Sequence, residues 1–319
     1  MSKNFNLVTD VEKFLEELEN LDQKPLYDMT AEEAREFLLS VQRKYPVNIK
    51  AEIIDRYVTC SNGAEVDIRI VRPENCDSEK LPAIIYAHGG GWVTGDKEVY
   101  DTLIKRLATE CHAAVIFVNY NLAPEFTYPA ALNEFCGVLE YVSKNPDEFN
   151  INPEKIITAG DSAGGNLAAA AALKTIYEGS NIIKAQILLY PVTDASMDTK
   201  SYDEFKNGPW LTKKSMEYFW DAYIPDKKTR KEVYASPLNA DADELKNLPP
   251  ALVITAENDV LRNEGEKFAL NLNRAGVDAA NIRLNGTIHD FMMLNALYNS
   301  APTNAAFTSV CGFLKKYLN

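Results

Sequence analysis

The chain has 319 residues, of which 46% are hydrophobic and 25% are charged, so it can bury one large core. Its formal net charge of -13 and its pI of about 4.8 argue against nucleic acid and anionic membrane surfaces as partners, since an acidic surface repels phosphate. Residues 1–10 lack the apolar stretch of a signal peptide, and the longest conspicuous apolar run, Leu167 to Leu173, is too short to span a membrane. We therefore expect a cytoplasmic protein that does not contact a membrane.

Cysteine and histidine usage predicts reduced thiols and no metal centre. The cysteines are odd in number, scattered and without a C-x-x-C pair, which favours reduced thiols in a cytosol. They are Cys60, Cys76, Cys111, Cys136 and Cys311. Only three histidines are present, which argues against a His-rich metal site. No metal or cofactor is predicted.

Residues 1–50 are predicted to form two amphipathic helices, because apolar residues recur there at helical spacing. Thr9 with Glu12 and Thr30 with Glu33 each match a capping box at a helix start. Pro46 stops the second pattern. Each helix has one apolar stripe, so each must pack against another part of the chain.

From Ile53 onward the pattern changes to strands. Ile53 to Thr59 and Glu65 to Val71 flank a turn that contains Gly63, which predicts a β-hairpin. Short apolar runs then alternate with longer helical segments, as in a parallel sheet buried on both faces, with the hairpin as its antiparallel edge. The runs are Ala83 to Ala87, Ala114 to Val118, Ile156 to Ala159, Ala185 to Tyr190, Ala251 to Ala256 and, more weakly, Ile282 to Leu284.

Residues 191–248 interrupt this alternation of strands and helices. They contain no good core strand but many aromatic residues, among them Trp210, Phe219 and Trp220. An insertion of this size after a sheet strand is more often a functional cover than a structureless loop. We therefore predict that the insertion covers part of the fold.

A G-x-S-x-G pattern lies at Gly160, Ser162 and Gly164, between a predicted strand and a predicted helix from Asn166 to Tyr177. This pattern resembles the nucleophile elbow of α/β-hydrolases. The turn is too tight for side chains two residues either side of the serine, and the helix N-terminus points at developing negative charge. A glycine-rich turn with an incidental serine is the alternative, but the strand–motif–helix context favours a nucleophile.

A glycine loop, His88 to Trp92, directly follows the predicted strand Ala83 to Ala87. Three consecutive glycines allow backbone N–H groups to converge on one point, as an oxyanion hole requires together with the amide of Ala163. The alternatives are a flexible turn or a phosphate-binding loop. No Lys-Ser/Thr pair follows the glycines, which argues against a P-loop.

His289 is the candidate base that a serine nucleophile needs. His88 belongs to the glycine loop, and His112 precedes a core strand, where a structural role is expected. His289 follows the last apparent strand, where an α/β-hydrolase places its base. Two carboxylates, Glu257 and Asp259, follow the strand before it. The residues alone leave both open as the partner of the imidazole, and either could instead cap a helix or pair with an arginine.

Several motifs together resemble the bacterial hormone-sensitive-lipase-like esterases. The similarity runs from about Ala83 to the C-terminus and extends less clearly to the N-terminal helices. The motifs are HGGGW at His88 to Trp92, YNLAPEFTYPA at Tyr120 to Ala130, GDSAGGN at Gly160 to Asn166, YPVTD at Tyr190 to Asp194 and LPPALVITAENDVLRNEGE at Leu248 to Glu266.

The resemblance implies an α/β-hydrolase fold with a mostly parallel central sheet, flanking helices and a helical cap. Residues 1–50 and the insertion 191–248 would form the cap, and residues 51–190 and 249–319 the catalytic core. It implies Ser162 as nucleophile, Asp259 as triad acid and His289 as base. Gly90, Gly91 and Ala163 would be the oxyanion donors, with His88 and Gly89 holding the glycine loop in shape.

Three residues depart from the pattern of that family. Asp290 stands where a glycine usually follows the triad histidine, which could raise the pKa of the histidine or redirect its partner. Asn121 replaces an arginine, and Asn263 replaces an acid before Glu264. None of the three belongs to the triad itself, so they bear on substrate choice and pH optimum.

We therefore expect a serine carboxylesterase that hydrolyses short- to medium-chain acyl esters through an acyl-enzyme. Its activity should rise as His289 loses its proton, near the reference pKa of roughly 6.5. Expected pocket-lining residues, each of which could equally be core, are Trp92, Trp210, Leu211, Phe219, Phe291 and Met292. The alternatives are another acyl hydrolase, such as a deacetylase or formamidase, or a non-catalytic receptor on the same scaffold. A small-molecule ester is the expected partner, and the sequence also allows a homodimer.

Overall fold

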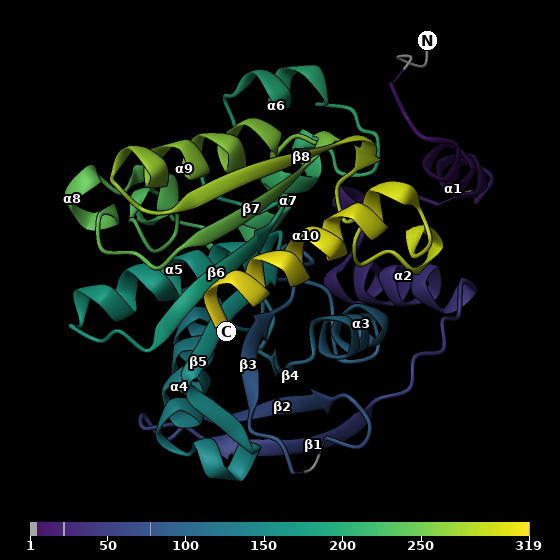
Figure 1. Ribbon diagram of the computed structural model, residues 1–319. Helices are drawn as coiled ribbons and strands as arrows, with labels where there is room; N and C mark the ends of the chain where they lie inside the picture. The colour runs from purple at the N-terminus through teal and green to yellow at the C-terminus, as the bar shows by residue number, and fades with distance from the viewer. Residues whose placement is uncertain (1–4, 22, 77, 319) are drawn as a thin grey trace.

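The structure, a computed structural model, describes residues 5–21, 23–76 and 78–318. One eight-stranded sheet runs through it in the order β1-β2-β4-β3-β5-β6-β7-β8 (Figure 1). The strands β1 and β2 form the antiparallel hairpin at one edge, β2 also pairs antiparallel with β4, and the remaining pairs are parallel. The strands are β1 Glu52–Thr59, β2 Glu65–Arg72, β3 Leu81–Ala87, β4 Ala114–Asn119, β5 Ile151–Asp161, β6 Ile183–Leu189, β7 Ala251–Asn258 and β8 Ala279–Ile288.

Helices cover both faces of the sheet, which explains why the central strands are mostly apolar and buried. One face packs against α4, α5 and α9, and the other against α3 and α10, with α1 and α2 beside them (Figure 1). The helices are α1 Thr9–Glu19, α2 Ala31–Lys44, α3 Asp101–Cys111, α4 Ala130–Lys144, α5 Ala163–Tyr177, α6 Lys200–Glu204, α7 Lys213–Tyr223, α8 Ala242–Leu245, α9 Arg262–Arg274 and α10 Ala301–Leu318. Short 3₁₀ turns are η1 Leu26–Asp28, η2 Pro146–Phe149, η3 Thr229–Lys231, η4 Pro237–Asn239 and η5 Asn295–Leu297.

The fold predicted from the sequence is confirmed, down to the hairpin at the sheet edge and the strandless insertion that follows β6. Of the two predicted capping boxes, one forms: the Thr30 hydroxyl accepts from the Glu33 amide, and Glu33 accepts from the Thr30 amide. The other prediction was wrong. The first helix begins at Thr9 itself, after Val8, so Thr9 lies inside the first turn and makes no side-chain cap.

The cysteine prediction was wrong for one pair. Cys111, at the end of α3, and Cys311, in α10, form a disulfide across a sequence separation of 200 residues. The two helices pack together on one face of the sheet, which places the Cα atoms 4.8 Å apart. Cys60, Cys76 and Cys136 are not in disulfides. The disulfide removes the argument from cysteine usage for a cytosolic chain.

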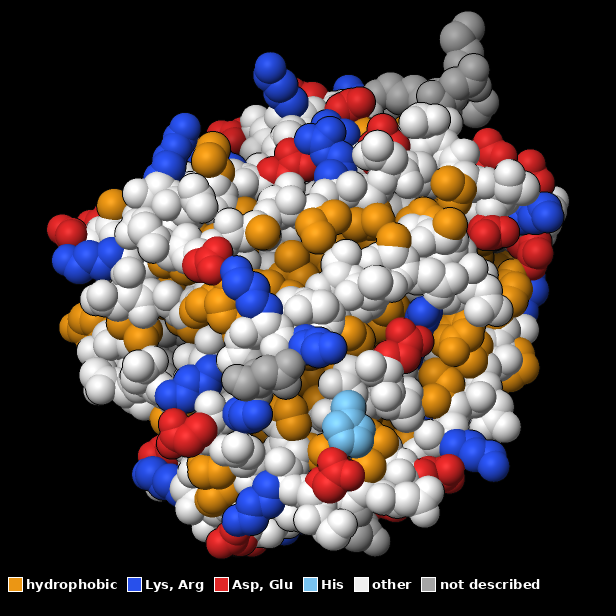
Figure 2. All heavy atoms as spheres, viewed as in Figure 1, with side chains coloured by type: hydrophobic (Ala, Val, Ile, Leu, Met, Phe, Trp, Pro, Cys, Tyr) orange, Lys and Arg blue, Asp and Glu red, His pale blue; other side chains and the backbone are white. Residues whose placement is uncertain are grey.

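Charged side chains are interspersed on the surface. On the face shown in Figure 2, lysine and arginine lie among aspartate and glutamate, without a continuous basic patch. In the described part of the chain, no helix is both long and apolar enough to cross a membrane. Residues 1–4, which belong to the stretch searched for a signal peptide, lie outside the described residues.

Candidate active site

The elbow that carries Ser162 joins β5 to α5. Ser162 has φ 52° and ψ -118°, a conformation that L-residues rarely adopt, and its N–H donates to the carbonyl of Leu189 at 2.8 Å. A Cβ on Gly164 would lie 2.0 Å from the Ala87 carbonyl oxygen, and one on Gly160 would lie 2.3 Å from the Gly164 oxygen. The glycines of the motif are therefore needed because backbone approaches backbone on both sides of the serine.

Three side chains meet at the carboxyl edge of the sheet, where ligand sites of α/β folds form. Ser162 follows β5, Asp259 follows β7 and His289 follows β8. The Ser162 hydroxyl lies 2.8 Å from His289 Nε2, and Asp259 Oδ2 lies 2.7 Å from His289 Nδ1. All three are buried, with 4% or less of each residue exposed. The arrangement holds the imidazole between a hydroxyl and a carboxylate, as proton transfer from the serine requires.

The other two nearby acids have different partners. Of the two carboxylates that the sequence left open, Glu257 Oε2 accepts from the Gly286 amide at 2.6 Å, whereas Asp259 is the one that contacts His289. Asp161 precedes the serine, but its carboxylate accepts from the Tyr86 hydroxyl, the Tyr100 hydroxyl and the Gly89 amide at 2.8 to 2.9 Å.

Asp161 is a functional candidate that the sequence analysis missed. Its contact with Gly89 ties the elbow to the start of the glycine loop. Burial and the nearby Asp290 raise the pKa of Asp161 to about 7. The hydrogen bonds from Tyr86, Tyr100 and Gly89 act in the opposite direction, because they stabilise the ionised carboxylate. The signal in the sequence was the acid inside the G-x-S-x-G motif, but its partners lie more than sixty residues away.

The glycine loop lies beside Ser162. Gly90 and Gly91 have φ values of 85° and 60°, and both line the same cavity as Ser162. Among the described residues, no acceptor lies on the backbone N–H of Gly90, Gly91 or Ala163. His88 Nδ1 lies 2.9 Å from the Gly89 oxygen. These free N–H groups could receive an oxyanion that forms on a carbonyl bound at the serine.

His88 packs against Tyr120 and so helps to hold the glycine loop in place. Its ring stacks on Tyr120 with centroids 4.1 Å apart, and the Tyr120 hydroxyl donates to the His88 carbonyl at 2.8 Å. Burial lowers the pKa of His88 to about 4, so the ring is neutral at physiological pH. A neutral His88 adds no charge near the triad.

His289 carries an unusual charge environment. Burial disfavours its protonated form, but the carboxylates of Asp259 and Asp290 outweigh burial and raise the pKa of His289 to about 9. Asp290 Oδ1 lies 3.4 Å from His289 Nε2, and Asp290 Oδ2 accepts from Trp210 Nε1 at 2.8 Å. The pKa of Asp290 is raised by burial. The departure from the family pattern at Asp290 therefore acts on the base itself, and the expected pKa near 6.5 is replaced by a higher one.

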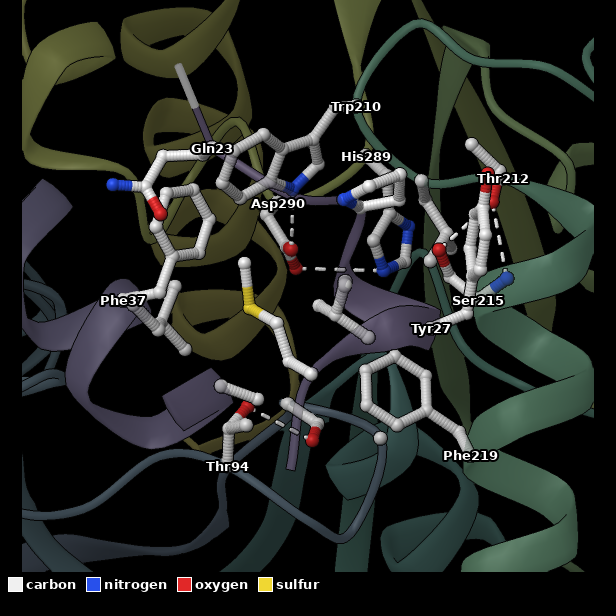
Figure 3. A pocket seen from close by; sticks show the side chains of 18 of the residues that line it. Gln23, Tyr27, Phe37, Thr94, Trp210, Thr212, Ser215, Phe219, His289 and Asp290 are labelled. Carbon is white, nitrogen blue, oxygen red and sulfur yellow. Dashed lines mark hydrogen bonds and ion pairs between the residues drawn. The ribbon is translucent and has the colours of Figure 1, made fainter. Parts of the chain in front are cut away.

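A cavity of about 440 Å³ opens onto Ser162 and His289. Its walls come from α1, η1 and α2 on one side, and from the insertion on the other, where Trp210, Leu211 and Phe219 line it. Figure 3 shows Trp210 and Phe37 at one end of the cavity, Phe219 near the other, and Asp290 between Trp210 and His289. A Cβ on Gly91 would lie 2.2 Å from the Phe219 ring, so the insertion packs directly onto the glycine loop.

Three expected pocket residues do not line this cavity. Trp92 is fully buried and stacks on Tyr223, with ring centroids 4.4 Å apart, so it joins the glycine loop to the buried face of α7. Phe291 and Met292 are buried in the core cluster that includes α3 and α10. Their side chains fill the core layer behind the triad. From the sequence alone, an apolar residue near a motif could lie either in that layer or in the cavity wall.

The two other departures from the family pattern lie outside the cavity wall. Asn121 donates through its amide N–H and Nδ2 to Glu134, at 2.8 and 2.7 Å. Asn263 Oδ1 accepts from the Ser201 amide at 2.8 Å and so holds the start of α6. Both therefore position segments near the site and do not contact the triad.

One group of potential metal ligands exists within the described residues. Cys76, Glu79 and His112 place one ligand atom each within 4.8 Å of one another. Glu79 and His112 are exposed and pair at 2.9 Å. The group lies near the amino end of β3, whereas the triad lies at the carboxyl edge of the sheet, so it plays no part in the chemistry at Ser162.

Comparison with known proteins fixes the family. Residues 84–293 match a family described by the alpha/beta hydrolase fold. The chain belongs to this family. It superposes with a TM-score of 0.97 on a thermostable esterase from Pseudomonas putida, at 39% identity, covering 100% of this chain and 99% of that one.

Named relatives agree with this assignment. The chain is 34% identical over 286 residues to an esterase of Gibberella moniliformis, with 89% of each chain covered. It is 34% identical over 242 residues to carboxylesterase NlhH of Mycobacterium tuberculosis, covering 74% of this chain and 75% of that one. This α/β hydrolase is therefore a hormone-sensitive-lipase-like esterase, a carboxylic ester hydrolase, and the resemblance seen in its motifs is confirmed.

Proposed function

We propose that this esterase hydrolyses short- to medium-chain acyl esters through an acyl-enzyme on Ser162. The observation that carries the proposal is the continuous chain of hydrogen-bond contacts from the Ser162 hydroxyl through His289 to Asp259, which opens into the cavity. In this mechanism Ser162 is the nucleophile and His289 the general base and acid. Asp259 fixes the imidazole tautomer and stabilises its cation.

Acylation begins when Ser162 Oγ attacks the ester carbonyl and His289 Nε2 takes its proton. The carbonyl oxygen becomes an oxyanion that accepts from the N–H groups of Gly90, Gly91 and Ala163. The tetrahedral intermediate then expels the alcohol, which receives the proton from His289. A water molecule repeats these steps on the acyl-enzyme and releases the acid, with Ser162 restored.

The cap sets the size of the acyl group in this proposal. Residues 1–50 and 191–248 both contribute wall to a cavity of about 440 Å³, which is in the range of small-molecule sites. A wall lined by packed cap side chains such as Phe219 favours a chain of a few carbons, because a longer chain would have to displace them.

The test of the function is a chain-length series of p-nitrophenyl esters. We expect kcat/KM for the acetate and butyrate to exceed that for the decanoate by at least about tenfold, since a ten-carbon chain would have to displace packed side chains of the cap. Active enzyme is counted by titration with a fluorophosphonate, which should add one phosphonyl group per chain at Ser162. No hydrolysis by folded protein would contradict the function, and a preference for decanoate would contradict the acyl range.

The activity is expected to rise with pH up to about 9. Acylation needs neutral His289, and a raised pKa means that the base is mostly protonated, and so inactive, at pH 7. Asp290→Asn removes one of the two carboxylates that raise this pKa. We therefore expect the acid limb of the kcat/KM profile to move to lower pH by about one unit. Initial rates with p-nitrophenyl butyrate, corrected for spontaneous hydrolysis, give the profile, and an unmoved limb would contradict this role of Asp290.

A further inference from the structure

Asp290 has a second consequence, because its carboxylate lines the substrate cavity together with Ser162 and His289. One oxygen accepts from the Trp210 indole at 2.8 Å, and the other makes no hydrogen bond with any described residue. That second oxygen lies 3.4 Å from the imidazole nitrogen that faces the serine. The carboxyl group of Asp290 therefore lies beside the imidazole that contacts the nucleophile, at the part of the cavity where an ester must react.

Once His289 is neutral, as acylation requires, no lining residue that the structure describes offsets this charge for a substrate. Among the described residues that line the cavity, Lys24 is the one lysine or arginine, and its Nζ lies 2.7 Å from both carboxylate oxygens of Glu33. Glu19 adds a further, exposed carboxylate to the wall. Behind the wall, Asp161 and Asp259 are also buried acids. The electrostatic potential around the reacting ester is therefore dominated by carboxyl groups, which surround His289.

We propose that Asp290 is a specificity-determining residue that makes this esterase select esters uncharged beside the scissile bond over esters that carry a carboxylate there. The inference rests on the proposed function, since it concerns the pocket around Ser162. A substrate carboxylate would lose its water on entering the cavity and, in the active form with neutral His289, would meet Asp290 without a lysine or arginine free to pair with it. A neutral substituent of the same shape avoids that repulsion, and one with an N–H or O–H could donate to the unpaired Asp290 oxygen.

Two nearly isosteric acetate esters test the selection. Acetoxyacetamide and acetoxyacetate differ in a carboxamide against a carboxylate one carbon from the ester oxygen. The quantity measured is the ratio of kcat/KM for the amide to kcat/KM for the acid, at one pH, in the wild type and in Asp290→Asn. Differences in intrinsic reactivity and in the pKa of His289 cancel when these ratios are compared, because each enzyme acts on both esters with the same base.

We expect the ratio to fall by about 10- to 100-fold in Asp290→Asn, since like charges a few ångströms apart in a partly buried site interact at that level. Glu19→Gln is the matched control, because Glu19 lines the same cavity but is exposed, so water screens its charge. The ratio of this control should move much less than that of Asp290→Asn.

Folding of the variants should not obscure the outcome. Asp290 has φ 66°, a region that asparagine and glycine both tolerate, so Asp290→Gly serves as a second variant with the same expectation. A ratio that stays within twofold of the wild type in both variants would overturn the proposal, as would wild-type enzyme that cleaves the acid as fast as the amide. Hydrolysis of p-nitrophenyl acetate is measured alongside, and its absence would identify failure of the esterase function instead.

Discussion

Ser162→Ala is expected to lower kcat for p-nitrophenyl butyrate by about four to six orders of magnitude, the scale seen when a triad serine is removed. The reason is that Ser162 supplies the atom that forms the acyl-enzyme, and alanine leaves His289 without a hydroxyl to deprotonate. The fold should persist, because alanine is smaller than serine and the unusual backbone at this residue is held by the Leu189 carbonyl and the surrounding glycines.

The control for that experiment is Ser309→Ala, on α10, where the hydroxyl bonds only to the carbonyl of Ala305 at the surface. It should retain wild-type turnover. Intact-mass measurement after fluorophosphonate treatment separates loss of the nucleophile from loss of folding. The wild type and Ser309→Ala should gain one adduct and Ser162→Ala none. Turnover that survives in Ser162→Ala, or an adduct that still forms on it, would show that another residue attacks the ester.

Those parts of the fold that depend on local rules were predictable from the sequence. A strand followed by G-x-S-x-G and a helix defines the elbow because the backbone conformation at Ser162 and the close contacts of its neighbouring glycines leave few other residues possible. The apolar runs within the central strands β3, β4, β5 and β6 follow from burial on both faces of the sheet.

Features that depend on contacts between distant segments were not predictable. Nothing in the spacing of Cys111 and Cys311 shows that α3 and α10 lie side by side. The partners of Asp161 lie in β3, in the glycine loop and just before α3. The contact of Asp290 with Trp210 likewise joins the end of β8 to the insertion. An aromatic residue in the glycine loop, such as Trp92, is predicted to line the cavity, but its ring packs against Tyr223 and Trp220 instead.

Asp259→Asn is expected to lower kcat by about 10⁴-fold while leaving KM little changed, since the wrong imidazole tautomer blocks proton transfer. In the wild type, Asp259 Oδ1 accepts from the Leu261 amide at 2.9 Å and Oδ2 faces His289 Nδ1. An asparagine would keep its oxygen on Leu261 and turn its NH₂ toward His289. Nδ1 would then have to accept, and Nε2 would carry the proton and could no longer take one from Ser162.

Glu257→Gln is the matched control, because it makes the same change of carboxylate to amide two residues earlier on the same strand end. Its oxygen could still accept from the Gly286 amide, which is the strongest contact of Glu257, and it does not contact His289. We expect its kcat to stay within about threefold of the wild type, as for a change that leaves the triad intact. A large loss of kcat in Glu257→Gln together with a small loss in Asp259→Asn would show that Glu257, and not Asp259, is the triad acid.

The pH profile of Asp259→Asn adds a readout that a merely structural defect would not move. Removing Asp259 takes away the larger of the two carboxylate contributions that raise the pKa of His289, while burial still disfavours the imidazolium. The acid limb of the residual activity should therefore shift to lower pH, and by more than in Asp290→Asn. A purely structural defect would lower the rate at every pH without shifting the acid limb of the profile. The direction of the shift therefore tests whether Asp259 is the group that stabilises protonated His289.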